Sequence, residues 1–74
     1  MRKTILDAVL AHAEGNLAVH KTNVEVYLHN PAGIGEHSDV VEAVIAEMEK
    51  MAHWQDIIDV LEEHFDEGYD AFEG

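Results

Sequence analysis

The chain contains no cysteine, a single proline and only four basic residues among its 74 positions. Without cysteine there is no disulfide framework, so packing has to stabilise the fold. No apolar run approaches the roughly 18 residues of a membrane span. The few bases leave a formal net charge of −12, which disfavours direct binding to nucleic acid because the phosphates would be repelled. We therefore expect a soluble, cytoplasmic protein that binds neither nucleic acid nor membrane directly.

Hydrophobic residues make up 47% of the chain, which argues against a disordered protein despite the charge. A chain of this length makes one domain at most, and it buries only about 60% of its unfolded surface. A solitary core of that size is marginal, so we expect self-association to add stability.

Residues 4–29 carry a helical pattern with one apolar seam. Its members recur at alternating steps of four and three residues, the heptad spacing that keeps one stripe facing a partner helix. They are Leu6, Leu10, Ala13, Leu17, His20, Val24 and Tyr27. Thr4 is the expected N-cap, and the cost of Gly15, about 1 kcal/mol relative to alanine, predicts a close helix approach or a local break. The alternating residues 23–28 would also suit a strand, but no second alternating run exists to pair with it.

A loop at residues 30–37 precedes a second predicted helix at about residues 38–65. Pro31 biases Asn30 away from helical backbone angles, which ends the first helix. Ser38 is a favourable N-cap for the second.

The second helix carries a seam of nearly the same spacing. Its members are Val41, Val44, Met48, Met51, Gln55, Ile58, Leu61 and Phe65. Gln55 interrupts the apolar pattern, and Trp54 is positioned to fill that layer by turning inward. Residues 66–74 form an acidic tail, for which a frayed end and an extra helical turn both fit.

Each helix carries more apolar surface than one seam uses, which predicts an assembly. We expect an all-α antiparallel hairpin that forms a coiled-coil-like, four-helix homo-oligomer, with a dimer favoured. The predicted oligomer interface consists of Ile5, Val9, His12, Val19, Val26, Trp54, Ile57 and Val60. The alternative is a monomer whose tail folds back as a third helix.

The charge is distributed unevenly along the chain. Acids and bases balance in residues 1–29, so the net charge of −12 lies in residues 30–74. Acids near a helix C-terminus are unfavourable with the helix dipole, which suggests a purpose other than helix stability. The predicted acidic partner surface consists of Asp56, Asp59, Glu62, Glu63, Asp66, Glu67 and Asp70. It could keep the protein soluble, bind a basic host protein in place of nucleic acid, or hold divalent cations.

Six histidines raise the possibility of a metal site, chiefly at His12, His20 or His53. Bundles with two carboxylate-bridged metals use Glu-x-x-His pairs that point into the core, and that spacing is absent here. For His20, a hydrogen bond to Gln55 or a symmetric pair at a dimer axis is the simpler expectation. We expect no metal and no cofactor.

Catalysis is not expected either. The Gly33-Ile34-Gly35 segment nearly matches a dinucleotide fingerprint, but a helix precedes it where the fingerprint needs a strand. Ser38 lies beside His37, but its hydroxyl is expected to cap a helix, and sequence neighbours rarely align as nucleophile and base. We expect a non-enzyme.

The segment NVEVYLHNPAGIGEHSDVVEAV, from Asn23 to Val44, resembles short uncharacterised proteins of marine tailed bacteriophages. The resemblance implies a phage source, and hence the cytoplasm of a host cell. It implies no activity and no functional residue. The expected role is that of a small acidic helical protein acting through protein–protein contacts. An acidic decoy for a basic host protein and a metal-binding bundle are the alternatives.

Overall fold

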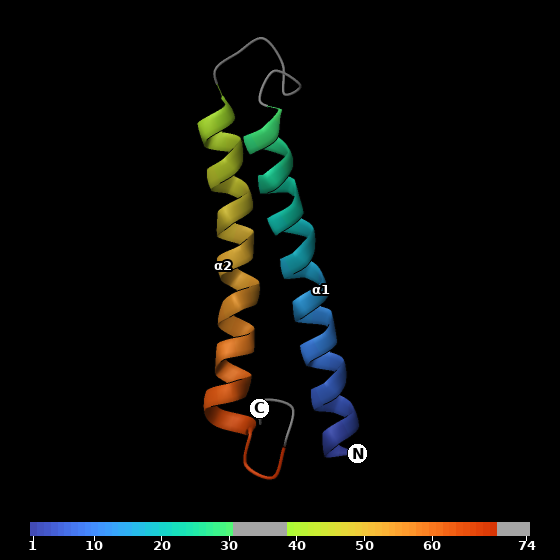
Figure 1. Ribbon diagram of the computed structural model, residues 1–74. Helices are drawn as coiled ribbons and strands as arrows, with labels where there is room; N and C mark the ends of the chain where they lie inside the picture. Colours follow the sequence, from blue (N-terminus) through green and yellow to red (C-terminus); the bar gives the residue numbers. More distant parts are fainter. Residues whose placement is uncertain (31–38, 70–74) are drawn as a thin grey trace.

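The computed structural model describes residues 1–30 and 39–69, which form two α-helices packed as an antiparallel hairpin (Figure 1). Helix α1 spans Arg2–His29 and helix α2 spans Val40–Phe65. The predicted all-α hairpin is confirmed, and the described part of the chain contains no strand. Neither helix has a stretch of the length and apolarity that crossing a bilayer requires.

The helix starts differ from those predicted. Helix α1 begins at Arg2 with Met1 as its N-cap, so Thr4 lies inside the first turn and does not cap it. Asp39 is the N-cap of α2, while the predicted cap Ser38 lies outside the described residues. The cap residues of both helices make no side-chain capping hydrogen bond.

The seam of α1 is the predicted one. Ala13 and Val24 are buried, and the other residues of the predicted line are half-buried against α2. The heptad spacing of apolar residues was sufficient here, since the line contains only one strongly polar member, His20.

The seam of α2 was predicted correctly at four positions and one residue too late at three. The buried or half-buried line is Val40, Val44, Glu47, Met51, Trp54, Ile58 and Leu61. Val41 and Met48 are instead 67% and 49% exposed, and Phe65 at the end of the helix is 48% exposed. Gln55 points outward and donates a hydrogen bond to Asp59 at 3.1 Å, so Trp54 occupies that layer. An apolar pattern cannot select a glutamate over the adjacent methionine, and that is where the prediction went wrong.

Helix α1 continues unbroken through Gly15. A Cβ atom added there would meet nothing within 4 Å. The predicted local break is therefore wrong, and α2 does not approach this glycine closely; a close approach by a helix of another chain stays a prediction.

The core of the hairpin is open. The buried apolar residues are Ala13, Val24, Ile58, Leu61 and Tyr69, and none of the large side chains in the described ranges is completely buried. The molecule is correspondingly elongated, with dimensions of 51 × 21 × 15 Å. Two helices alone form one line of contact and leave both flanks of that line accessible.

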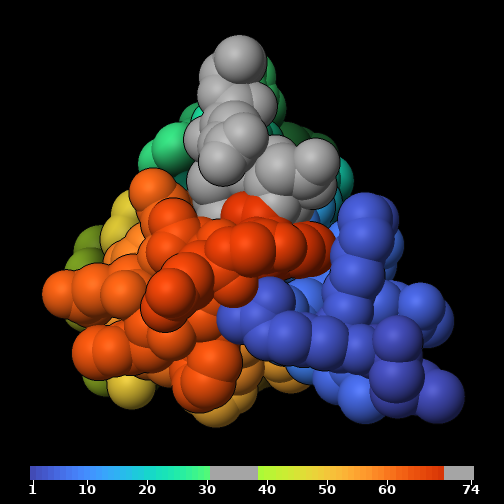
Figure 2. Space-filling model, turned by 90° about the horizontal axis from the view of Figure 1, so that it is seen from below, coloured from blue at the N-terminus to red at the C-terminus, as the bar shows by residue number. Residues whose placement is uncertain are grey.

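Residues 66–69 make a turn that crosses the terminal end of the hairpin, where the two helices diverge in the view of Figure 1. Seen from below, this turn lies against the first residues of α1 (Figure 2). Gly68 adopts a positive φ of 72° there, which glycine tolerates. The described part of the predicted tail is thus a turn, while residues 70–74 lie outside the described residues.

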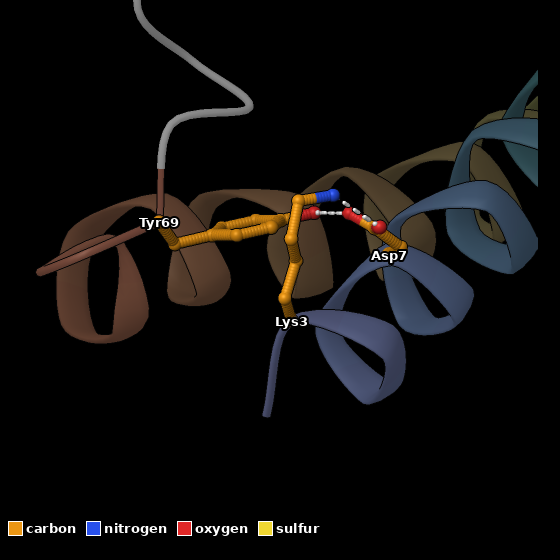
Figure 3. A network of polar contacts seen from close by, with 3 residues as sticks. All are labelled: Lys3, Asp7 and Tyr69. Carbon is orange, nitrogen blue, oxygen red and sulfur yellow. Dashed lines mark hydrogen bonds and ion pairs between the residues drawn. The ribbon is translucent and has the colours of Figure 1, made fainter. Parts of the chain in front are cut away.

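Tyr69 anchors the turn to α1. Its side chain is 3% exposed, and its hydroxyl donates a hydrogen bond of 2.7 Å to Asp7. The Lys3 ammonium donates to the same carboxylate at 2.8 Å (Figure 3). Both contacts favour the ionised form and lower the pKa of Asp7, with Lys3 as the larger cause.

Arg2 makes a second contact at this end. Its guanidinium donates a 2.7 Å hydrogen bond to the backbone carbonyl of Phe65, at the C-terminus of α2. A positive charge is favourable at that end of the helix dipole. The terminal end of the hairpin is therefore held by polar contacts between the two ends of the described chain.

Candidate functional site

The observed seams divide the remaining hairpin surface into distinct faces. Residues that directly precede a seam residue line one flank, and residues that directly follow one line the other. The preceding set is Ile5, Val9, His12, Asn16, Val19, Asn23 and Val26 of α1, with Ala43, Ala46, Lys50, His53, Ile57 and Val60 of α2. No helical member of this set is a carboxylate, although the N-cap Asp39 precedes Val40 in the same way, and Asp56 and Glu49 border hollows that members of the set line. We call it the carboxylate-free face.

The opposite flank, which we call the acidic face, is different in composition. It consists of Asp7, Ala11, Glu14, Ala18, Lys21, Glu25 and Leu28 of α1, with Val41, Ile45, Met48, Ala52, Gln55, Asp59 and Glu62 of α2. The other helical carboxylates are Glu42, Glu49, Asp56 and Glu63 on the outer side of α2, and Glu47 in the seam. The acids of the two helices thus lie mainly on the acidic face and the outer side of α2, and Asp56 and Glu49 reach the border of the carboxylate-free face.

The predicted oligomer interface falls on the carboxylate-free face, apart from Trp54. Ile5, Val19, Val26 and Val60 are 53%, 54%, 57% and 47% exposed, and Val9 is 38% exposed. These are large apolar side chains in contact with water along nearly the whole length of the hairpin. Their role in binding another chain stays a prediction.

The structure brings three of these predicted residues together. Val9, Ile57 and Val60 line a largely apolar hollow of about 270 Å³, which His53, Asp56 and Phe65 also border. The hollow joins α1 to α2 at the terminal half of the carboxylate-free face. A side chain from another molecule would find an apolar recess there.

Trp54 lies in the seam and is half-buried, with an imidazole on each side of its ring. The ring centroids of His12 and His53 lie 5.2 and 4.8 Å from it, both in edge-to-face geometry. Both histidines belong to the carboxylate-free face. The tryptophan packs beneath these histidines and lines a hollow of that face with Ala46, Lys50 and His53, and its predicted role in an interface stays a prediction.

A polar network crosses the seam at Glu47, which sequence reasoning missed. Its Oε2 is 2.9 Å from Nδ1 of His20, and its Oε1 accepts a 2.7 Å hydrogen bond from the amide of Asn23. The side chains of His20 and Glu47 are only 17% and 12% exposed. An ionised carboxylate can only accept, so the Nδ1 of His20 carries the proton that it donates. The prediction that His20 bonds Gln55 is wrong.

The network favours the ionised carboxylate. The hydrogen bond from Asn23, and next the one from His20, lower the pKa of Glu47. The third member of the network, Asn23, has an amide side chain, which is not a nucleophile, so the three residues do not form a catalytic triad. Their hydrogen bonds join α1 to α2 and fix the register of the two helices. The sequence did contain a signal for this network. His20 and Asn23 lie one turn apart on α1, and Glu47 directly precedes Met48, the apolar residue that was predicted for the seam.

The predicted acidic partner surface is exposed on α2 and the turn after it. Asp59, Glu62, Glu63 and Asp66 surround one shallow hollow, while Asp56 lies one turn away and borders the apolar hollow on the other flank. Glu67 is exposed and Asp70 lies outside the described residues.

The three histidines considered for a metal do not meet. His20 pairs with Glu47, while His12 and His53 flank Trp54. In the described ranges, no group of three or more histidine, aspartate or glutamate side chains is arranged to hold a metal ion.

No family model matches the chain, and neither a curated protein nor a solved structure matches it. What can be inferred about function therefore comes from the residues and their geometry.

Proposed function

We propose that the chain is a non-enzymatic protein that acts through protein–protein contacts, and that it pairs with a second copy through the carboxylate-free face. The observation that carries this proposal is the composition of that face, which gathers exposed large apolar side chains and has carboxylates only at its border, where Asp56 and Glu49 lie. Two hairpins stacked on this face form a four-helix bundle.

The exposed area of the chain as a whole is large for its mass, which favours burial of some surface against a partner. A compact protein of 8.3 kDa has an accessible surface of about 4,600 Å². The hairpin exposes 5452 Å², roughly 900 Å² more than that compact reference. A standard interface removes about 800 Å² from each partner, so one self-contact would hide the excess.

The charges favour the same arrangement. Each copy carries a formal net charge of −12, and contacts through the acidic face would place carboxylates of one copy against those of the other. The carboxylate-free face reduces this repulsion, since it contributes Lys50 and no carboxylate of its own. A second copy is therefore the partner that this face suits.

Substitution of Val19 tests the proposal. Val19 is 54% exposed at the middle of the face, so Val19→Asp should leave the helices folded while placing an unpaired carboxylate in the interface of each copy. We expect dimer affinity to fall by about 100-fold or more, because a buried unpaired charge costs several kcal/mol. Size-exclusion chromatography with light scattering measures the change.

Thr22→Asp is the matched control, because Thr22 is exposed on the outer side of the same helix. It should remain dimeric under conditions in which Val19→Asp is monomeric. Equal masses for the two variants would contradict the assignment of the interface to this face.

A second role for the assembled protein is that of an acidic decoy for a basic host protein. The grouping of Asp59, Glu62, Glu63 and Asp66 around one hollow favours it. Under this proposal, affinity purification from host cells recovers a basic protein whose binding weakens steeply with salt. The phage source implied by residues 23–44, and with it the host cytoplasm as location, remains part of the proposal.

A further inference from the structure

The acidic face carries a second apolar surface at the loop end of the hairpin. Leu28, Val41, Ile45 and Met48 are 61%, 67%, 50% and 49% exposed there. Pairing through the carboxylate-free face would leave this surface uncovered, because it lies on the opposite flank of the seam. Soluble proteins rarely expose such a patch without a binding purpose.

A groove runs between the helices beside this patch. It has a volume of about 540 Å³, twice that of the hollow on the other flank, and Leu17, Val24, Leu28, Met48 and Met51 form its apolar lining. Methionine side chains are unbranched and polarisable, and adapt to partners of different shape. Gln55, Lys21 and Glu25 also border the groove.

The charge of the whole acidic face, more than that of the groove lining, indicates the occupant. Lys21 and Glu25 border the groove itself, and the rest of the face adds Asp7, Glu14, Asp59 and Glu62 without a further base. A second copy would bring the same acids against them, whereas a cationic partner would be attracted. The occupant should therefore be apolar at its centre and basic at its edges.

The dimensions of the patch set the length of that occupant. Along α2 it extends from Val41 to Gln55, which corresponds to about 21 Å at the rise of an α-helix. A helix of about four turns covers this length, with anchors spaced i, i+3, i+4 and i+7.

We infer that the groove of the acidic face binds a basic amphipathic helix of a partner protein. This inference rests on the proposed function, in which the carboxylate-free face is occupied by a second copy. It names the chemistry of the partner: leucine-like anchors on one side of a helix and lysine or arginine along its edges.

A fluorescein-labelled peptide of leucine and lysine, about 14 residues long and amphipathic as a helix, is the probe. Its binding to the full chain is measured by fluorescence anisotropy. A scrambled peptide of the same composition should bind about tenfold more weakly or less. Equal binding of the two peptides would show attraction by net charge only and overturn the inference.

The Met48→Glu variant distinguishes binding in a specific groove from attraction by net charge, because the two predict opposite changes in peptide affinity. In a specific groove it removes an apolar contact and should weaken binding of the amphipathic peptide by about tenfold, whereas attraction by net charge would become stronger. Thr22→Glu adds the same charge on the outer side of α1 and should not weaken binding. Met48→Gln keeps the net charge and should still weaken it, and binding by the Met48 variants as tight as that by Thr22→Glu would contradict the groove.

Sedimentation of the same variants separates this inference from the proposed function. Met48→Glu should remain dimeric, and monomeric Val19→Asp should still bind the peptide. Loss of the dimer in Met48→Glu but not in Val19→Asp would show that a second copy occupies the groove, which would overturn both proposals. A wild-type monomer that binds the peptide through Met48 would contradict the proposed dimer alone.

Discussion

Glu47 shows how one polar residue can set the register of a helix pair. Both of its carboxylate oxygens are used, one by His20 and one by Asn23, at a seam position that apolar residues otherwise occupy. In the described residues no buried side-chain polar atom lacks a hydrogen-bond partner. A shift of α2 by one residue would place Met48 in the seam and leave His20 facing no acceptor. The network therefore favours the observed register over the one that the apolar pattern suggested.

Asn23→Ala tests the network at its strongest contact. The substitution removes a hydrogen bond to a charged group and should lower the free energy of unfolding by more than a substitution outside the network does. Asn16→Ala is the control, because the Asn16 amide donates only to the backbone carbonyl of His12 in its own helix. Urea unfolding at one fixed protein concentration measures both, and equal stability of the two variants would show that the network contributes nothing.

Asp7 predicts a response to acid at the terminal end of the hairpin. Its pKa is lowered in the folded chain by Lys3 and Tyr69, so the unfolded chain binds the proton at a higher pH than the folded one does. The stabilisation is present above the ordinary carboxyl range and is lost as the pH falls through the lowered folded value. We expect the NMR signals of Tyr69 to shift to those of a released turn on acidification. In the Asp7→Asn variant, the NMR signals of Tyr69 should no longer depend on pH in this range. If they still shift with pH as in the wild type, another group causes the response.

At the scale of the elements, the sequence supported most of the hairpin but not the face of α2. The seam of α1 was predictable because its spacing is regular, and the helix ends at His29 and Phe65 were predicted where the structure has them. The seam of α2 was ambiguous, since valines at 40 and 41 and the pair Glu47/Met48 permit two registers. Contacts between residues far apart in sequence, such as Tyr69 with Asp7, leave no local pattern and could not be foreseen.

Gly15→Ala tests the account of α1 as one uninterrupted helix. An added methyl group meets nothing within 4 Å, so the substitution removes the helix penalty of glycine without a clash. We expect stabilisation by about 1 kcal/mol, measured by chemical unfolding at fixed concentration. Destabilisation would mean that another chain packs closely against this side of α1, which the proposed bundle does not include.

At the scale of the whole molecule, the proposed function assigns a different partner to each flank of the seam. The carboxylate-free face suits a copy of the same acidic chain, because apolar contact there brings no acids together. The acidic face combines an apolar groove with carboxylates, which suits a basic helix. The eight residues predicted as an interface largely anticipated the first face, although the exclusion of acids from it became visible only when the register of α2 was known.

Sedimentation equilibrium of the full chain at micromolar concentration tests the central claim most directly. The account predicts a folded species of twice 8.3 kDa at neutral pH, in which a second copy covers the exposed apolar side chains of the carboxylate-free face. A single chain of 8.3 kDa that unfolds cooperatively and independently of concentration would contradict it.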